Sequence, residues 1–456
     1  MKTLKYYLYA VVALFIYVPL MAQKQVPPPG GKPHDFKLPQ KINNELPNGM
    51  RSTLVQYGNV PKATFNLIIK TGNAHENKNE VWLADLMGQM MEQGSKTMDF
   101  KTIAKKVAGM GGQLSISVGP DETSISGSVL SEYAADFTKL LGDLVMNPAF
   151  PESELARLKS DMKRNLTVQQ SVPQSQANAR FYKAIYGDQP YGNYFPTTEM
   201  IDSYTLPMIK DFYNENVGAK RSVLYVAGKF NATALQSTIK TVFGKWKAGK
   251  EVSYPEETAT AKAETIIIDR KNAPQTTILL GLPTITPADD DYIAATVANA
   301  IIGGSFMSRI TSNIRENKGY TYSPSSSLSS RRNGSLWMQS ADVTAAHTID
   351  ALNEIKKEIA KLQQEPPSKE ELEGIQNFRA GVFVLQNSSP FGIISQLNFL
   401  DKFKLPDSYL TNFVANTYKV TPEKVSAIAR SSYQVDKMTL VMVGDKESIE
   451  KQQAEK

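Results

Sequence analysis

Two polar residues on a predicted helix have the spacing of a metal-ligand pair. The stretch LADLMGQMMEQG, residues 83–94, places apolar residues at positions i, i+3, i+4, i+7 and i+8 of an amphipathic helix. Asp85 and Gln89 are four residues apart, so their side chains lie on the same side of that helix. Aspartate is a zinc ligand, whereas glutamine is a poor one. A metal site here needs further ligands from elsewhere; the alternative is that both residues form the polar face of a packed helix.

The residue types that usually bind zinc are scarce. The chain has no cysteine and three histidines, His34, His75 and His347. None of the three has a histidine or cysteine partner at metal-ligand spacing, which argues against a conventional zinc site made by this chain alone. His75 and Glu76 precede the helix in a predicted loop, and we do not assign them to the site. The lack of cysteine also excludes disulfides, a thiol nucleophile and a lipoprotein attachment site.

The composition is that of a folded globular protein. The chain has 456 residues, of which 41% are hydrophobic and 21% charged, and its mean hydropathy is −0.31. The formal charge is +6, or +4 once Lys2 and Lys5 are removed with the N-terminal segment. No dense run of Lys and Arg is present, so the sequence gives no support to nucleic-acid binding.

The N-terminus has the order of a secretory signal peptide. Lys2 and Lys5 precede the uncharged run YYLYAVVALFIYVPLMAQ, which contains Pro19 and closes near the small residue Ala22. We expect residues 1–22 to be a cleaved signal and the protein to be exported to the periplasm. The alternative is an uncleaved anchor, because the run is nearly long enough to span a membrane. Residues 23–42 are rich in Pro and Gly and are expected to form an extended leader.

Beyond the leader, the sequence repeats with an offset of roughly 215 residues. LPMIKDFYNENVGAKRSVLYVAGKF, from Leu206, matches TPEKVSAIARSSYQVDKMTLVMVGDK, from Thr421. Each copy has a Pro-opened helix, a short turn, an apolar strand, and a Gly that leads to a final helix. Upstream, the helical pattern of FPESELARLKSDMKRNL matches that of PPSKEELEGIQNFRAGV. We therefore expect an α+β fold of two homologous halves, residues 43–255 and 256–456, arranged as a clamshell around a chamber.

One segment of the second half resembles a family signature. In NAIIGGSFMSRITSNIRENKGYTYSPSS, from Asn299, a Gly pair and Ser305 open a predicted helix, and Arg315 lies on its last turn. Gly319 then ends the helix, and Tyr322 starts a predicted strand. This order resembles the GG-x-x-SRL…LRE-x-x-G-x-x-YS signature of the M16 zinc peptidases, the insulinase, pitrilysin and mitochondrial processing peptidase family. The resemblance extends over nearly the whole chain beyond the leader and implies the fold of that family.

The resemblance also implies where a zinc site would lie. Active members of the family carry H-x-x-E-H on a helix: the two His bind zinc, the Glu activates the metal-bound water, and a Glu on a later helix is the third ligand. These positions fall on Asp85, Gly88, Gln89 and Asn165, and a supporting acid falls on Leu158. Gly88 cannot take up a proton, and Gln89 and Asn165 are poor ligands. We therefore expect no metal and no cofactor in this chain.

The second half retains a pair of residues that belongs to the active site in the family. Arg315 and Tyr322 match the family's Arg/Tyr pair, which reaches the active site from the other half or subunit, grips the substrate backbone and stabilises the oxyanion. Taken without the resemblance, Arg315 is a surface ion pair with Glu316 and Tyr322 a half-buried strand residue.

The family's substrate-binding strand corresponds to GQLSISVG, residues 112–119, an edge to which an extended peptide can add. Its central residues are Leu114, Ser115, Ile116 and Ser117.

These features predict the non-catalytic subunit of an exported M16-type peptidase. A partner chain with H-x-x-E-H would hold the zinc, and this chain would supply Arg315 and Tyr322 while remaining inactive alone. The alternative is a non-enzymatic peptide-binding or scaffold protein on the same fold. Loss of the zinc ligands fits both, whereas the retained Arg and Tyr favour the first. A peptidase with an unconventional site has least support, because no G-x-S-x-G elbow is present.

Overall fold

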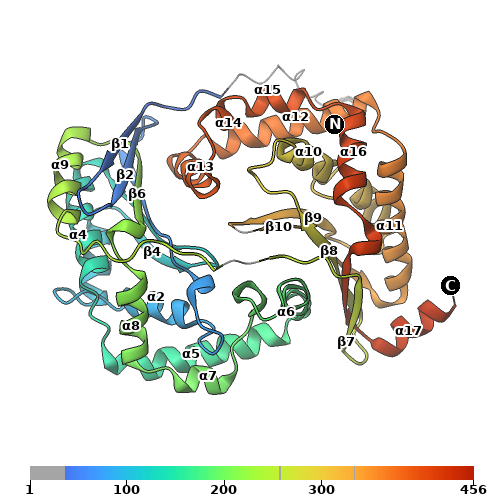
Figure 1. Ribbon diagram of the computed structural model, residues 1–456, viewed down its shortest axis with the longest axis horizontal. Helices are drawn as coiled ribbons and strands as arrows, with labels where there is room; N and C mark the ends of the chain where they lie inside the picture. The colour runs from blue at the N-terminus through green and yellow to red at the C-terminus, as the bar shows by residue number, and fades with distance from the viewer. Residues whose placement is uncertain (1–35, 256–257, 333, 456) are drawn as a thin grey trace, which may run out of the picture. The chain divides into compact units, whose positions relative to one another are not determined.

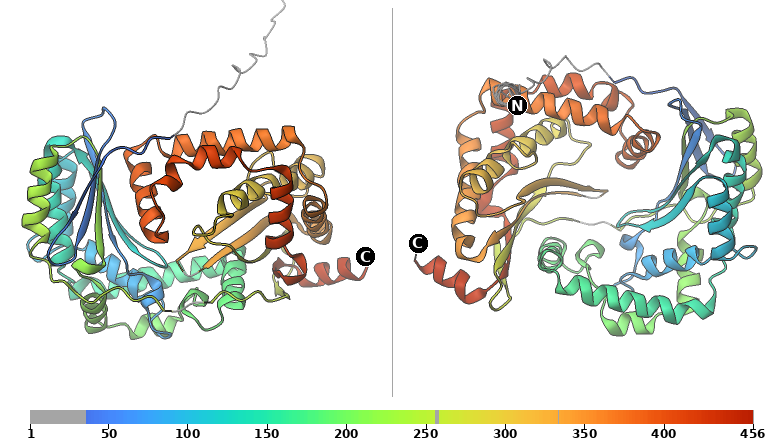
Figure 2. Two further views of the ribbon diagram at one scale, coloured as in Figure 1. Left: turned by 45° about the horizontal axis from the view of Figure 1, so that its top comes forward. Right: turned by 180° about the vertical axis from the view of Figure 1, so that it is seen from behind.

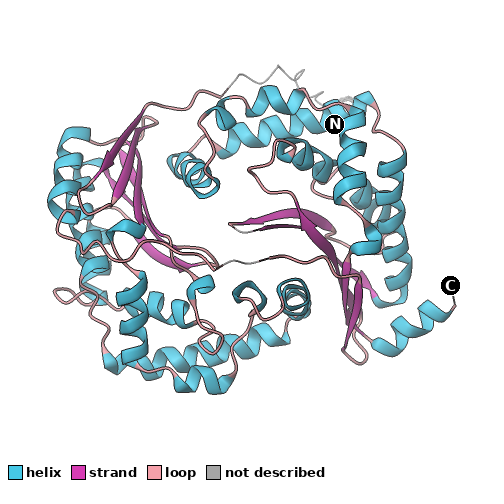
Figure 3. Cartoon of the chain, viewed as in Figure 1, coloured by secondary structure: helices cyan, strands magenta, loops and turns pink. Residues whose placement is uncertain are grey.

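Two β-sheets, one in each half of the chain, organise the computed structural model (Figure 1). The structure describes residues 36–255, 258–332 and 334–455, so the predicted signal and most of the predicted leader lie outside the described residues. Figure 2 shows that the blue-to-green first half and the yellow-to-red second half each contain one sheet. Figure 3 shows that helices and strands are mixed in both halves. The predicted α+β fold of two halves is therefore confirmed.

The first sheet has the strand order β1-β2-β6-β3-β5-β4. Strand β6, SVLYVAG, is buried along its whole length, as its continuous apolar sequence predicts for a central strand. Strand β4 lies at the edge, and its residues alternate between exposed and half-buried. The strands span β1 Lys41–Glu45, β2 Arg51–Gln56, β3 Lys62–Ile69, β4 Gln113–Val118, β5 Thr123–Leu130 and β6 Ser222–Gly228.

The second sheet repeats this plan with the order β7-β11-β8-β10-β9. Its parallel pair β7–β11 corresponds to the parallel pair β2–β6, and the three antiparallel pairs that follow correspond in the same order, whereas β1 has no counterpart in the second sheet. The strands span β7 Glu264–Asp269, β8 Gln275–Thr284, β9 Ser325–Arg331, β10 Gly334–Thr344 and β11 Thr439–Gly444. The sheet order thus agrees with the internal repeat predicted from the sequence.

The helices follow the same repeat. In the first half they span α2 Leu83–Glu92, α3 Phe100–Gly109, α4 Ala134–Met146, α5 Glu152–Ser171, α6 Pro173–Tyr186, α7 Thr198–Ser203, α8 Leu206–Asn216 and α9 Ala232–Phe243. In the second half they span α10 Tyr292–Ile302, α11 Thr348–Gln364, α12 Lys369–Gln386, α13 Pro390–Phe403, α14 Ser408–Thr411, α15 Phe413–Tyr418, α16 Pro422–Ser432 and α17 Lys446–Ala454. The matched helices α8 and α16 begin alike, because Thr205 and Thr421 each accept a hydrogen bond from a backbone N–H in the first turn.

One helix of each half packs on the sheet of the other half. Helix α13 packs on β6 and β3 of the first sheet, on the face opposite α4 and α9 (Figure 1). Helix α6 of the first half packs in turn on β11 and β8 of the second sheet. Ile393 and Ile394 of α13 are fully buried against the first sheet, and each such side chain contributes about 1.5–3 kcal/mol. The two halves therefore share parts of their cores.

Ion pairs join the same surfaces. Asp401 of α13 accepts from Arg51 at 2.9 Å and from Lys70 at 2.7 Å. One residue further on, Lys402 pairs with the buried Asp121 at 2.6 Å. Tyr191 also donates to Asp121 through its hydroxyl group. Of these pairs, the one with Asp121 is the most buried, and leaving that carboxylate without its cation would be costly.

Within the described part of the chain, no helix is both long and apolar enough to cross a membrane.

Candidate functional site

Helix α2 places two of the predicted zinc positions at a pocket. Asp85 and Gln89 are partly exposed and line a cavity of about 250 Å³. Asn165, from α5, lines the same cavity, so three of the four positions are brought together. The predicted apolar stripe of α2 is buried, as expected, and comprises Leu83, Leu86, Met87, Met90 and Met91. The alternative that Asp85 and Gln89 are only the polar face of a packed helix is therefore incomplete, because that face is the wall of a pocket.

The fourth position, Gly88, faces the sheet at close range. A Cβ atom placed on Gly88 would lie 2.8 Å from a methyl carbon of Val118 and 3.6 Å from one of Ile116. Both residues belong to β4, so glycine is what allows α2 to pack this closely on the edge strand. A glutamate side chain at position 88 would require the Val118 side chain to shift. Leu158, at the position of the supporting acid, is buried in the hydrophobic core of the first half.

Asp85 belongs to a small hydrogen-bonded cluster that the sequence did not reveal. Asn73 donates through Nδ2 to Asp85 Oδ2 at 2.6 Å and to Glu76 Oε1 at 3.1 Å. Glu76 also accepts from the backbone N–H groups of Trp82, at 3.0 Å, and Ala84, at 2.8 Å, and so caps the start of α2. Glu76 lies in a loop, as predicted, and neither Glu76 nor His75 lines the pocket; Glu76 is connected to Asp85 through Asn73.

Burial changes the acidity of this cluster. Desolvation raises the pKa of Asp85 from 3.8 to about 6, and the hydrogen bond from Asn73 only partly opposes it. Desolvation, followed by the nearby Asp85 charge, raises the pKa of the Glu76 carboxyl well above its usual range. Both carboxyl groups therefore stay protonated to a higher pH than exposed carboxyl groups do.

The residues at these positions do not fit zinc. Asp85 is the one anionic group among the four positions, and its Oδ2 is already held by Asn73. Gln89 and Asn165 offer neutral amides, and Gly88 offers no side chain. Across residues 36–455, apart from the short gaps, no three His, Cys, Asp or Glu side chains are grouped so that they could hold a metal ion.

Arg331 is a pocket residue that sequence reasoning missed. It ends β9 in the second half, yet it lines the same cavity as Asp85. Its guanidinium lies 4.4 Å from the ring centre of Tyr182 and 4.5 Å from that of Tyr191. No described carboxylate lies within ion-pairing distance of it. The available signal was the pair of arginines in SSRRNG, residues 329–334, but only the tertiary fold brings Arg331 to the pocket beside α2.

Arg315 and Tyr322 lie together on another surface and do not line this pocket. The Arg315 guanidinium is stacked between two rings, 4.9 Å from the centre of Tyr322 and 4.5 Å from that of Phe306. Tyr322 is 78% exposed and Phe306 65% exposed. Arg315 Nε also lies 3.3 Å from Glu316, so the ion pair considered from sequence is present together with the stack. Tyr322 is not half-buried, contrary to the structural alternative.

The boundaries around this pair differ from the prediction. Gly303 and Gly304 do not open a helix; Gly303 ends α10, and helical backbone resumes only at Arg309. Arg315 then lies in the last turn of a π-helical segment, Thr311–Asn317, as the spacing predicted. Gly319 has φ +64°, the left-handed conformation expected of the residue that ends this helix. Tyr322 precedes its strand, because β9 begins at Ser325 rather than at Tyr322.

The predicted substrate strand is an edge strand, but one of its outward groups is occupied. Strand β4, which contains Leu114, Ser115, Ile116 and Ser117, pairs with β5 alone. The backbone N–H of Ile116 donates at 3.0 Å to the carboxylate of Glu92, the last residue of α2. An apolar pocket of about 360 Å³ lies beside the strand, lined in part by Phe100 and Ile103 of α3. The edge can accept a further strand only after the Glu92 carboxylate has left it.

Comparisons with known proteins point to one family. A family model described as "Insulinase (Peptidase family M16)" matches residues 53–199. A second, described as "Peptidase M16 inactive domain", matches residues 203–378.

Among individual relatives, a Rickettsia felis protein described as an "Uncharacterized zinc protease" is 25% identical over 346 residues, which are 75% of this chain and 83% of that protein. A Helicobacter pylori protein described as "Non-peptidase homolog YmxG" is 21% identical over 396 residues, which are 85% of this chain and 90% of that protein.

Solved structures give the same result. The peptidase M16 inactive domain from Pseudomonas fluorescens superposes with a TM-score of 0.82 at 25% identity, over 89% of this chain and 98% of that one. The first half of the periplasmic protease PqqL from Escherichia coli superposes with a TM-score of 0.72 at 16% identity, over 92% of this chain and 95% of that one. The second likeness is one of fold alone.

Proposed function

Because this chain belongs to the M16 peptidase family, we propose that it is a non-zinc-binding subunit that completes the active site of a second M16 chain carrying H-x-x-E-H. The observation that carries the proposal is a contrast within one chain. Position 88 carries no glutamate but a glycine that packs closely against Val118, whereas Arg315 stacks on the solvent-exposed ring of Tyr322. The first half has lost the groups for hydrolysis, and the second half keeps groups that bind a peptide carbonyl.

The chemistry supplied by this chain would be hydrogen-bond donation. The Arg315 guanidinium and the Tyr322 hydroxyl are donors that can hold a substrate carbonyl and the negative charge that develops on its oxygen. Stacking on Phe306 and Tyr322 fixes the guanidinium plane before substrate binds, so less freedom is lost on binding. Zinc would belong to the partner chain and would supply the attacking water there.

The substrate would bind as an extended strand along β4. Leu114, Ser115, Ile116 and Ser117 would pair with it through backbone groups, and its side chains would enter the apolar pocket beside α3. Glu92 would have to release the Ile116 N–H first. This contact would disfavour binding of weak peptides to the lone chain.

A second candidate is a non-enzymatic peptide-binding or scaffold protein. The pocket at Asp85, Gln89 and Asn165 favours it, because amide and carboxyl side chains can bind a polar ligand without a metal. Under either proposal the protein would be exported, by a signal at residues 1–22 that is cleaved or, alternatively, kept as an anchor.

The test combines zinc analysis with a peptidase assay. The mature chain would be purified, assayed for zinc, and mixed with candidate H-x-x-E-H chains in the presence of a quenched fluorescent peptide. We expect no zinc and no hydrolysis from this chain alone, and hydrolysis in the mixture. Arg315→Ala and Tyr322→Phe should each lower kcat of the mixture by about 10²-fold, the typical effect of losing one oxyanion donor.

Matched controls separate chemistry from surface effects. Arg164→Ala and Tyr418→Phe change an exposed arginine and an exposed tyrosine elsewhere, and both should leave the rate unchanged. Stoichiometric zinc in the lone chain would contradict the proposal. Equal rates with and without this chain would favour the peptide-binding alternative.

A further inference from the structure

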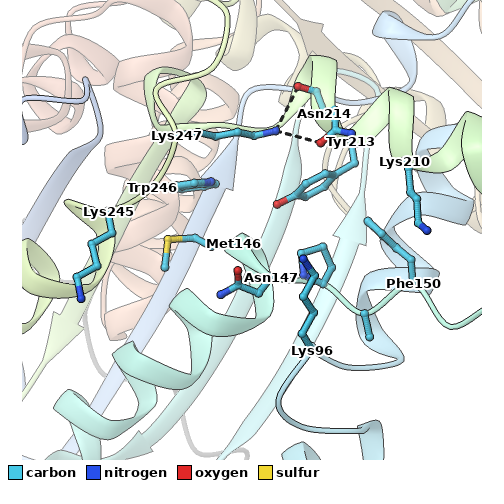
Figure 4. Close-up of a pocket in the computed structure, with 12 residues that line it drawn as sticks. Lys96, Met146, Asn147, Phe150, Lys210, Tyr213, Asn214, Lys245, Trp246 and Lys247 are labelled. Carbon is cyan, nitrogen blue, oxygen red and sulfur yellow. Dashed lines mark hydrogen bonds between the residues drawn. The ribbon is translucent and has the colours of Figure 1, made fainter.

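A second pocket lies away from the candidate site and is lined by four lysines. It has a volume of about 750 Å³ and is built from the loop after α2, the end of α4, helix α8 and the segment after α9. Figure 4 shows its four lysines arranged around Asn147 and the ring of Tyr213. The lysines are Lys96, Lys210, Lys245 and Lys247. No acidic residue is among the residues that line it.

Backbone contacts fix the positions from which these lysines project. The N–H of Lys96 donates to the carbonyl of Asn147 at 2.8 Å, which ties the loop after α2 to the end of α4. On the other side, Asn48 holds the carbonyl of Trp246 at 2.9 Å, and the Ala219 N–H holds that of Lys247 at 3.0 Å. These contacts fix the backbone at Lys96 and Lys247, while Lys210 projects from helix α8.

The pocket has more donors and positive charge than acceptors. None of its four lysines has an ion-pair partner among the described residues, although many lysines elsewhere in the chain do. Lys247 donates to the backbone and side-chain oxygens of Asn214, at 3.4 and 3.2 Å, and lies 5.1 Å from the centre of the Tyr213 ring (Figure 4). Asp143, one helical turn before the lining residue Asn147, already accepts hydrogen bonds from Ser95, Thr97 and Asn147.

Two features of the pocket wall add to this imbalance. Trp246 is 4% exposed, and its indole N–H has no acceptor within the described structure, although buried donors are usually paired. Phe150 has φ +45°, a conformation that bulky residues rarely adopt, and its ring packs edge-on against Tyr213 at 5.3 Å. Strained backbone persists where the surroundings fix it, and such sites are often ligand sites.

We propose that this pocket binds a small anion that carries two or more phosphate groups. Lysine ammonium groups are strong point-charge partners of phosphate, and four of them exceed what one phosphate group can contact. The volume falls in the range of small-molecule sites and is large for a single inorganic ion. The aromatic side chains of Tyr213, Trp246 and Phe150 would meet the uncharged part of such a molecule. This inference does not depend on the proposed peptidase role.

Titration calorimetry at physiological salt tests the proposal, with inorganic tripolyphosphate as the probe. At this ionic strength weak surface charge effects are largely screened. We expect one binding site in the full mature chain. The side chains of Lys96 and Lys210 make no hydrogen bond or ion pair within the described structure, so Lys96→Gln/Lys210→Gln should fold normally and weaken binding by about 10²-fold, roughly tenfold per lysine. Lys247→Gln should weaken it further.

The control removes the same charge outside the pocket. Lys101→Gln/Lys105→Gln changes two exposed lysines of α3 and should alter the affinity by less than about twofold. Equal losses in the two double variants would overturn the proposal, because binding would then follow net charge. Absence of tripolyphosphate binding would also overturn it. A second arm uses vesicles of phosphatidylglycerol in phosphatidylcholine; binding to vesicles without binding to tripolyphosphate would assign the surface to lipid headgroups instead.

Discussion

Replacing Asp85 by asparagine should stabilise the protein at neutral pH. The introduced amide would keep an oxygen that accepts from Asn73, but it would carry no charge to desolvate. The pKa of Asp85 is raised from 3.8 to about 6 by burial, and each pKa unit corresponds to about 1.36 kcal/mol. The folded state therefore loses up to about 3 kcal/mol when this carboxyl ionises, and Asp85→Asn removes that loss.

The sign of the effect gives it a distinctive pH profile. Between pH 4 and pH 6 the folded chain holds a proton on Asp85 that the unfolded chain has released, so the contribution of Asp85 to the free energy of unfolding falls as pH rises. The advantage of Asp85→Asn should therefore be absent below about pH 4, grow through about pH 6, and be constant above it. Urea midpoints measured from pH 4 to pH 8 give this difference directly.

A control and a zinc arm make the measurement decisive. Asp136→Asn, at an exposed site on α4, should change the free energy of unfolding by less than about 0.5 kcal/mol at every pH. Added zinc should leave the midpoint of the wild-type chain unchanged, because a ligand stabilises only the state that binds it. A variant that is less stable than wild type at pH 8, together with a midpoint that rises with zinc, would refute the reasoning. Asp85 would then be an ionised metal ligand.

Two further perturbations probe the packing of the site. Gly88→Ala should lower the free energy of unfolding by about 1–3 kcal/mol in urea titration, because the added methyl group meets Val118. The double variant Gly88→Ala/Val118→Ala should recover part of this loss. Failure to recover it would show that the strain arises elsewhere. Lys402→Met should lower the free energy of unfolding by about 3–5 kcal/mol, because it leaves the buried Asp121 without its cation. Lys78→Met, at an exposed ion pair, should lower it by less than about 1 kcal/mol. Similar losses in the two variants would contradict a special role for the buried pair.

The repeat and the main elements were predictable because their signals are local. The apolar stripe of α2, the continuous apolar strand β6 and the Pro-opened helices α8 and α16 each follow from periodicity and capping within one segment. The convergence of Asp85, Gln89 and Asn165 required the family resemblance as well, since α5 lies far along the chain from α2. The role of Gly303 was misjudged, because a Gly pair signals a helix end as readily as a helix start.

What was missed depends on contacts between distant segments. Asn73 bridges Asp85 and Glu76 only because the segment before α2 folds back onto its first turn. Arg331 reaches the same pocket from the other half of the chain. The lysine pocket gathers residues from segments that are far apart in sequence, and none of them lies in a basic run. Residue spacing within one segment does not predict contacts between segments that are far apart in the sequence.

The close contact between Gly88 and Val118 bears on how this lineage can evolve. Restoring the catalytic residues takes four substitutions, Asp85→His, Gly88→Glu, Gln89→His and Asn165→Glu, and none of them removes the methyl group of Val118. A larger residue at position 88 would also require the Val118 side chain to shift or to be replaced by a smaller one, and a smaller residue at position 118 alone would loosen the packing of α2 on β4. The residue at position 88 is thus coupled to the residue at position 118, so the two positions are expected to change together.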